Sequence, residues 1–209
     1  MKTILTFLGT HPSLTTYSYK GQVVEGEVFA KALLKFLEFD RMLVFSTPKA
    51  HETTWPLLAE LEDDRIREIP ITISARREDI WGLFDTVIEQ VDEGETVVFD
   101  ITHGLRSIPF LAFLFAAYLK TAKQVTIDGI YYGAYELGDR VKGIPAPVID
   151  LSEYVTMLDW IVATDQFIDT GNARRLADLL SRQGRGHRAS NAAAGKLRTV
   201  SMAAFLGQP

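Results

Sequence analysis

Short runs of apolar, β-branched and aromatic residues alternate along this chain with longer stretches in which apolar residues recur at helical spacing. The strand-like runs begin near Ile4, Met42, Ile66, Thr96 and Thr126. Such runs are typical of strands buried on both faces, and the stretches between them are typical of amphipathic helices. The repetition of strand and helix predicts an α/β fold, in which a Rossmann-like and mostly parallel sheet is flanked by helices.

Two smaller features complete the predicted sheet region. Residues 15–19 and 22–25 alternate between apolar and polar as a small hairpin would, with Lys20 and Gly21 at its turn. Residues 148–151 are predicted to form a last strand at the edge of the sheet.

The pattern also divides the chain into a sheet-containing part and a helical part. Helices are expected over residues 27–39 and 51–62, and Pro56 should bend or restart the second of them. From Ser152 onward the apolar spacing becomes wholly helical. We therefore predict a ligand-binding domain over residues 1–151 and a helical extension or linker over residues 152–209.

The polar turn that follows the Thr96 strand is the richest in chemical groups. It carries Asp100, Thr102, His103, Gly104, Arg106 and Ser107, and an apolar helix is predicted directly after it, over residues 108–119. In open α/β folds ligands bind at the carboxyl ends of the strands, where the free N–H groups of the next helix attract anions. Glycine lets the backbone approach a ligand, arginine binds phosphate through a planar fork, and hydroxyls add donors. The turn is predicted to face phosphate, although it lacks the spacing of a P-loop or a dinucleotide fingerprint.

A simpler interpretation of this turn remains open. Asp100 and Thr102 could cap the following helix, His103 could be a surface histidine, and Gly104 could merely ease the turn. Capping explains only two of these residues, so the crowding of His, Gly and Arg favours a ligand site.

A second polar turn, 9–13, follows the first predicted strand and contains Gly9, Thr10, His11 and Ser13. If the first strand lies beside the Thr96 strand, the two turns flank one crevice. Tyr132 and its neighbours could wall that crevice, although at strand spacing some of these tyrosines must face the core.

Composition narrows the choice of partner. The chain has 209 residues, 47% of them hydrophobic, with a net charge of −5 and no cysteine. This charge argues against a DNA duplex as the main partner and favours a small anionic ligand. The lack of cysteine excludes disulfides and thiolate chemistry and fits a cytoplasmic protein. No signal peptide is expected at the start, and the apolar run 108–119 is too short to cross a membrane.

Metal and hydrolase chemistry find little support. The four histidines, His11, His51, His103 and His187, do not have the paired helical spacing of a zinc site. The nucleophile elbow of an α/β-hydrolase is also missing from the sequence. We expect neither a metal nor a cofactor.

The run Asp100-Ile101-Thr102-His103-Gly104 resembles the DxTHG signature of a CRISPR-associated family, and the following residues 105–109 are similar to that family's usual continuation. Residues 7–10 and 170–173 resemble it more weakly. The family belongs to the CARF-domain proteins, which are Rossmann-like receptors for cyclic oligoadenylates made by type III CRISPR complexes.

This resemblance implies a homodimeric sensor of a cyclic oligoadenylate in type III antiviral defence, with cyclic tetra-adenylate favoured. It also allows an alternative, a metal-independent ring nuclease in which a ribose 2′-hydroxyl attacks the adjacent phosphate. The expected ligand-binding residues are Gly9, Thr10, His11, Ser13, Asp100, Thr102, His103, Gly104, Arg106, Ser107 and Tyr132. The candidates for catalysis are Thr10, Ser13, Thr102 and His103.

Arg182 and His187 have the spacing of the Arg and His of HEPN ribonucleases, the effector domains that usually follow CARF domains. Two glycines between them make a poor helix interior, and few residues follow. We do not expect a working HEPN site, and we interpret the chain as a sensor portion, truncated or naturally short, whose effector domain is missing.

Overall fold

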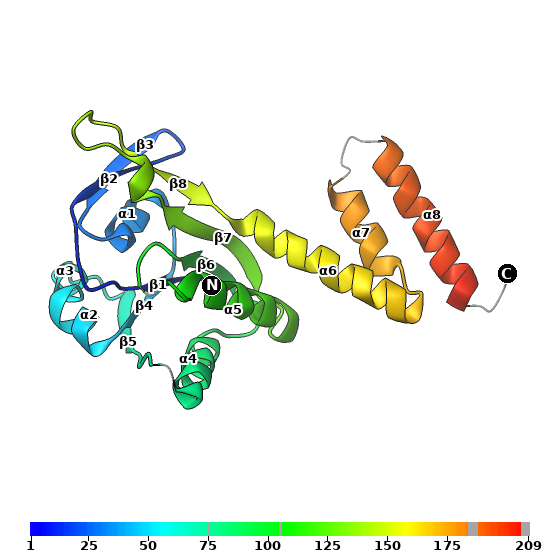
Figure 1. The fold of residues 1–209 in the computed structure, drawn as a ribbon, viewed down its shortest axis with the longest axis horizontal. Coiled ribbons are helices and arrows are strands. Elements are labelled where there is room, and N and C mark those ends of the chain that lie inside the picture. Colours follow the sequence, from blue (N-terminus) through cyan, green and yellow to red (C-terminus); the bar gives the residue numbers. More distant parts are fainter. Residues whose placement is uncertain (75, 105, 184–187, 206–209) are drawn as a thin grey trace. The chain divides into compact units, whose positions relative to one another are not determined.

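A computed structural model describes residues 1–74, 76–104, 106–183 and 188–205 (Figure 1). The chain divides into two compact units, Met1–Ser152 and Glu153–Pro209. The first unit is an α/β domain with an eight-stranded mixed sheet, and the second is helical.

The sheet runs in the order β3-β2-β8-β7-β6-β1-β4-β5. Its strands are β1 Lys2–Phe7, β2 Thr15–Tyr19, β3 Gln22–Gly26, β4 Arg41–Ser46, β5 Ile66–Pro70, β6 Thr96–Asp100, β7 Thr126–Gly133 and β8 Ala146–Asp150. The five neighbouring strands β7, β6, β1, β4 and β5 all run parallel to one another. β8 is antiparallel to β7 but parallel to β2, and β3 is antiparallel to β2. The prediction of a Rossmann-like and mostly parallel sheet is confirmed.

The first unit's α-helices are α1 Phe29–Phe36, α2 Pro48–Thr53, α3 Pro56–Ala59, α4 Arg77–Glu89 and α5 Ile108–Ala122, and η1 Tyr135–Leu137 is a short 3-10 helix. α1 is shorter than the helix predicted over 27–39 because Leu37 is already extended. The helix predicted over 51–62 is two helices, and Pro56 begins the second of them. Proline is well placed there, since the first turn of a helix needs no N–H from it.

β6 lies in the interior of the sheet, between β1 and β7. Val97, Val98 and Phe99 are fully buried, as their uninterrupted apolar run predicts. Because β1 is parallel to β6, the turns that follow these two strands emerge at the same edge of the sheet.

The prediction that residues 148–151 form an edge strand is wrong. β8 lies between β7 and β2, because the β2–β3 hairpin joins the sheet and supplies the edge instead. The hairpin closes through Lys20 and Gly21, whose φ angles are 47° and 81°. Two successive positive φ angles are typical of the tight turn whose twist matches that of the strands.

The core lies on both faces of the sheet. On the α1 face, Ile4, Met42, Val44 and Val98 pack in one buried cluster with Phe29 and Leu33 of the helix. Alternation along the strands directs Leu5, Phe7 and Phe45 to the other face. α4 and α5 pack together, with the rings of Phe84 and Phe115 5.7 Å apart.

A buried ion pair ties the strands together near their amino ends. Glu95 is 4% exposed, and one of its carboxylate oxygens accepts from Arg41 Nη2 at 2.9 Å. The same carboxylate accepts from the Thr3 hydroxyl at 2.6 Å and from Asp92 N–H at 3.0 Å. These contacts lie at the end of the sheet opposite to the two polar turns.

The second unit contains α6 Ser152–Thr170, α7 Arg174–Gln183 and α8 Arg188–Phe205. α7 and α8 are joined by an ion pair between Asp178 and Arg198, 2.7 Å apart. Arg182 lies in α7, but His187 lies outside the described residues, so the Arg–His spacing stays untested. In the described part of the chain, no helix is both long enough and apolar enough to span a membrane.

Candidate functional site

The turns after β1 and β6 meet at the carboxyl edge of the sheet. A Cβ placed on Gly9 would lie 3.5 Å from Gly104 N and 3.6 Å from His103 Cβ. Beside this meeting point is a cavity of about 310 Å³, which we call the central cavity. It is lined by Phe7, Leu8, Gly9, Thr10, Phe45, Thr47, Lys49, Ile71, Ile73, Gly104 and Ile108. Of the predicted ligand-binding residues, Gly9, Thr10 and Gly104 line this cavity.

Gly104 has two reasons to be glycine. Its φ is +98°, a backbone conformation that residues with a side chain rarely adopt. A Cβ there would also lie 3.3 Å from Ile108 Cγ1 and 3.4 Å from Phe7 Cβ. The backbone at Gly104 is therefore left bare at the cavity wall, as close approach to a ligand requires.

Asp100 holds the start of the loop in place through two buried hydrogen bonds. It is fully buried, with one oxygen accepting from the Thr6 hydroxyl at 2.6 Å and the other from Thr102 N–H at 2.8 Å. Burial raises the pKa of this carboxyl, while His103, Thr6 and the Thr102 N–H act in the opposite direction. Asp100 thus fixes the start of the loop and presents no oxygen to solvent. It does not cap α5, whose N-cap residue is Ser107.

Thr102 connects the loop to the neighbouring strand. Its hydroxyl oxygen accepts a hydrogen bond from Gly133 N–H, at the end of β7, at 2.8 Å. Gly133 has no room for a side chain, because a Cβ would lie 2.8 Å from carbons of both the Tyr17 and Phe29 rings. The Thr102 hydroxyl is therefore a structural contact between β6 and β7.

His103 points to the start of α1 and not to open solvent. Its Nε2 accepts from Phe29 N–H at 3.1 Å, and Val28 at the N-cap supplies no side-chain acceptor of its own. The imidazole therefore satisfies one of the N–H groups that every helix leaves free at its first turn. With Nε2 accepting, the ring is neutral and its proton lies on Nδ1. Burial lowers the pKa of His103, and the nearby Asp100 carboxylate opposes that effect.

This geometry predicts a pH-dependent stability that His103→Gln should remove. Because the pKa of His103 is lowered by folding, the unfolded chain binds the proton first as pH falls through about 6.5. Stability is then lost until the pH reaches the lowered pKa, at up to about 1.4 kcal/mol per pH unit. In His103→Gln a carboxamide oxygen still accepts from Phe29 N–H but does not titrate.

Urea denaturation at about pH 7.5 and 5.5 measures the difference between the two proteins. The other histidines are common to both and cancel in the comparison. His103→Ala is the matched control, since it loses the acceptor and should be destabilised at both pH values. An identical pH dependence in wild type and His103→Gln would show that His103 is not held neutral in the fold.

The remaining predicted residues are more exposed. Thr10 Oγ1 lies 2.9 Å from His11 Nδ1 at the surface of the first turn. Arg106 is exposed, and Ser107 begins α5 without a side-chain cap. Arg106 thus displays its guanidinium at the start of a fifteen-residue helix, where anions are favoured.

Eight of the eleven predicted ligand-binding residues do not line the central cavity, and three of these eight lie against other parts of the domain. Ser13 lines a different cavity of about 650 Å³, between the β2–β3 hairpin and residues 135–146. Ser107 lines a third cavity, between α4 and α5. Tyr132 donates its hydroxyl to Glu136 at 2.6 Å, and its pKa is raised by burial and by that carboxylate.

Most of the far wall of the central cavity consists of residues outside the predicted ligand-binding set. Thr47 and Lys49 follow β4, and Ile71 and Ile73 follow β5, so all four come from the ends of the other parallel strands. Thr54 fixes the first turn by donating to Gly9 O at 2.7 Å. The rule that ligands bind at strand ends could have identified the first four residues. Nothing in the local sequence indicates the contact of Thr54.

The site offers donors for an anion and no evident metal site. Its wall combines bare backbone at Gly9 and Gly104, the hydroxyl of Thr10 and the ammonium of Lys49. Across the described residues, no group of three or more His, Cys, Asp or Glu side chains could hold a metal ion. The arrangement is suited to recognition of phosphate.

Comparison with known proteins adds one relative. No family model matches the sequence. Over 114 residues the chain is 33% identical to CRISPR-associated protein MJ1674 of Methanocaldococcus jannaschii. The match covers 51% of this chain but only 17% of that protein, so the chain spans less than a fifth of the relative's length. The name of this relative specifies neither a ligand nor a reaction.

Proposed function

We propose that this chain is a CRISPR-associated sensor that binds a cyclic oligoadenylate, with cyclic tetra-adenylate favoured. The observation that carries the proposal is the meeting of Gly9 and Gly104 beside a cavity at the carboxyl ends of β1 and β6. The second of these loops has the DxTHG sequence, and similarity to a CRISPR-associated protein supports the same assignment.

The charges around the cavity suit a phosphodiester ligand. Lys49 lines the cavity, and Arg106 is exposed at the start of α5. We infer that Gly104 N–H and the first turn of α5 contact phosphate oxygens, and that Arg106 adds a charge-assisted pair of hydrogen bonds.

We also propose that two copies bind one ring. The cavity volume of about 310 Å³ lies at the lower end for small-molecule sites, whereas a cyclic tetranucleotide is a large ligand with rotational symmetry. Two identical sites around a two-fold axis match that symmetry. Apolar side chains for the contact between copies are exposed on α5 (Phe110, Leu114 and Tyr118) and on α6 (Met157, Ile161 and Ile168).

Calorimetry with cyclic tetra-adenylate and cyclic hexa-adenylate tests the proposal. We expect the tetramer to bind with a stoichiometry of one ring per two chains, and light scattering to give a dimer at micromolar concentration. Absence of binding with both rings would remove the proposed function. A strictly monomeric protein that still bound one ring per chain would rule out the proposed dimer but not the proposed ligand.

Arg106→Ala should weaken binding of cyclic tetra-adenylate by about 1.5–3 kcal/mol, or about 10- to 150-fold in Kd. The loss is expected because the variant removes one charge-assisted contact while leaving the loop backbone in place. Calorimetry measures the change. Arg67 is also exposed but lies on β5, so Arg67→Ala is the matched control and should bind as the wild type does. Equal losses in the two variants would mean that Arg106 acts only through the overall charge.

A second candidate function is cleavage of the bound ring. One specific observation favours it: in a cavity beside the central cavity, the carboxylate of Glu68 accepts from the Ser46 hydroxyl and lies 2.9 Å from Nδ1 of His51.

A further inference from the structure

The helix α5 is apolar on all sides, although one of its sides faces solvent. From Ile108 to Leu119 its sequence contains no charged residue. One side is buried in the first unit through Ile108, Ala112, Phe115, Ala116 and Leu119. On the other side Phe110 is 70% exposed, and Leu114 and Tyr118 are 46% and 45% exposed. Because a helix that is apolar all round is normally buried, we expect a partner to cover the exposed side.

The neighbouring helix α4 extends this apolar surface. Its Ile80 and Trp81 are exposed, and the ring of Phe84 lies 5.9 Å from that of Trp81 and 5.1 Å from that of Tyr118 on α5. A groove of about 270 Å³ opens between the two helices and is lined in part by Ile80 and Phe110. Contiguous apolar surface of this kind marks a site of interaction. We call it the α4–α5 face, made of Ile80, Trp81, Phe110, Leu114 and Tyr118.

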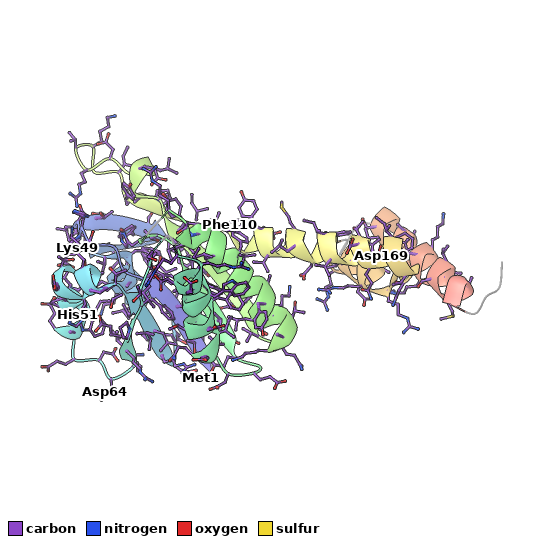
Figure 2. All side chains as sticks on the ribbon, turned by 60° about the horizontal axis from the view of Figure 1, so that its bottom comes forward. Met1, Lys49, His51, Asp64, Phe110 and Asp169 are labelled. Atoms are coloured by element: carbon purple, nitrogen blue, oxygen red, sulfur yellow. The ribbon has the colours of Figure 1, made fainter. Side chains whose placement is uncertain are left out.

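The α4–α5 face adjoins the candidate ligand site. Phe110 lies near the beginning of α5, four residues after Arg106 (Figure 2). Ile73 lines both the groove between α4 and α5 and the central cavity. A two-fold axis through this face would therefore bring the DxTHG loops of two copies close together, as one symmetric ring bound by two copies requires.

The distribution of charge favours a second copy of this chain as the cover. In a two-fold contact the same patch of both copies meets, so a patch with a net charge meets that same charge again. Two chains that each carry a net charge of −5 also repel each other. The uncharged run of α5 avoids this repulsion where the copies would be closest.

Charge also distinguishes α5 from α6, the other helix with several exposed apolar side chains. α6 exposes Glu153, Asp165 and Asp169, and its sequence contains neither lysine nor arginine. Two α6 helices side by side would bring like charges together, which opposes association. Of the two helices, α5 is the better surface for contact between copies.

We propose that the α4–α5 face is the two-fold interface between two copies of this chain, with Phe110 as its anchor. The inference rests on the proposed binding of one ring by two copies, and it adds the surface that holds the copies together. Phe110 is the most exposed side chain of the face, and buried aromatic anchors dominate the energy of many interfaces. Arg106 of each copy then lies beside the interface, so the ring site is incomplete in a single chain.

Light scattering of the full chain at micromolar concentration tests the interface without ligand. Phe110→Glu and Leu114→Glu each place a charge in the contact and should raise the dissociation constant of the dimer by about 100-fold or more, giving monomers. Ile161→Glu, on α6, is the matched control, because Ile161 is 63% exposed and receives the same charge. It should remain a dimer like the wild type. Circular dichroism checks that each variant is folded.

Calorimetry with cyclic tetra-adenylate gives a second measurement on the same proteins. The two α5 variants should bind the ring about 100-fold more weakly than the wild type, because each monomer holds it through one loop instead of two. Leu114 lies one turn further from Arg106 than Phe110 does, so equal losses in both variants indicate loss of the dimer and not a local effect of charge. Ile161→Glu should bind as the wild type does.

The other outcomes separate this inference from the proposed ligand. A folded Phe110→Glu that stays dimeric overturns the interface, and a monomeric Ile161→Glu does the same by placing the contact on α6. A monomeric wild type overturns it too, since a different partner must then cover α5, but binding of the ring by that monomer would leave the sensor function standing. A dimeric wild type that does not bind the ring, with monomeric α5 variants, would remove the ligand and support the interface.

Discussion

Asp100→Ala should destabilise the protein by about 2–6 kcal/mol and abolish ligand binding at the DxTHG loop. The substitution leaves the Thr6 hydroxyl and Thr102 N–H without their acceptor, at about 1–3 kcal/mol for each buried group. Both partners lie on elements that shape the site, since Thr6 is near the end of β1 and Thr102 is in the loop itself. Urea denaturation measures the stability, and calorimetry with cyclic tetra-adenylate measures the binding.

Asp100→Asn is the control that separates shape from charge. Its carboxamide oxygen can accept from Thr102 N–H, and its amide can donate to the Thr6 hydroxyl, which then acts as the acceptor. We expect this variant to lose less than about 1.5 kcal/mol, because Thr6 Oγ1 and Thr102 N–H each keep a hydrogen-bond partner. If Asp100→Asn were as unstable as Asp100→Ala, the negative charge and not the pair of hydrogen bonds would hold the loop.

Glu95→Ala should cost about 3–5 kcal/mol of stability, because it leaves the partly buried guanidinium of Arg41 without its carboxylate. The Thr3 hydroxyl and Asp92 N–H lose an acceptor at the same time. Since this network lies at the end of the sheet opposite to the site, the folded fraction should bind ligand with unchanged affinity. Urea denaturation and calorimetry on the same sample measure the two quantities.

Glu60→Ala provides the comparison for this prediction. Glu60 pairs with Lys31 at 2.9 Å, but its side chain is 58% exposed, so the loss should be at most about 1 kcal/mol. A loss in Glu95→Ala as small as that in Glu60→Ala would show that the Arg41 guanidinium finds water once its partner is removed.

The fold was predictable because the physics that determines it is local in the sequence. Uninterrupted runs such as 97–99 require burial on both faces, so the sequence predicts the strands, and right-handed crossovers then favour a parallel sheet. The position of β8 was not predictable in this way. Its neighbour β2 comes from the beginning of the chain, and the few residues paired between them leave no pattern in either segment.

The candidate site was predictable only in part. Strand-end turns rich in Gly, Thr and His indicate where a ligand binds, and Gly9 and Gly104 do meet there. The sequence does not show the direction of each side chain. The contact of His103 with Phe29 N–H joins residues 74 positions apart, and Ser46, Glu68 and His51 come from three elements. Such contacts depend on the register of packed elements, which no local spacing encodes.

The order of the strands in the sheet differs from the order in which a ribosome makes them. β1 and β4 can pair early, β6 then adds to the free edge of β1 and β7 to that of β6, but β8 must pair with both β7 and β2. The hairpin that ends at Tyr19 therefore waits for a strand that begins at Ala146. Until that strand emerges, the edges of β2 and β7 are open to pairing with other chains. Protection of the nascent protein from aggregation thus depends on how quickly β8 follows β7 during synthesis.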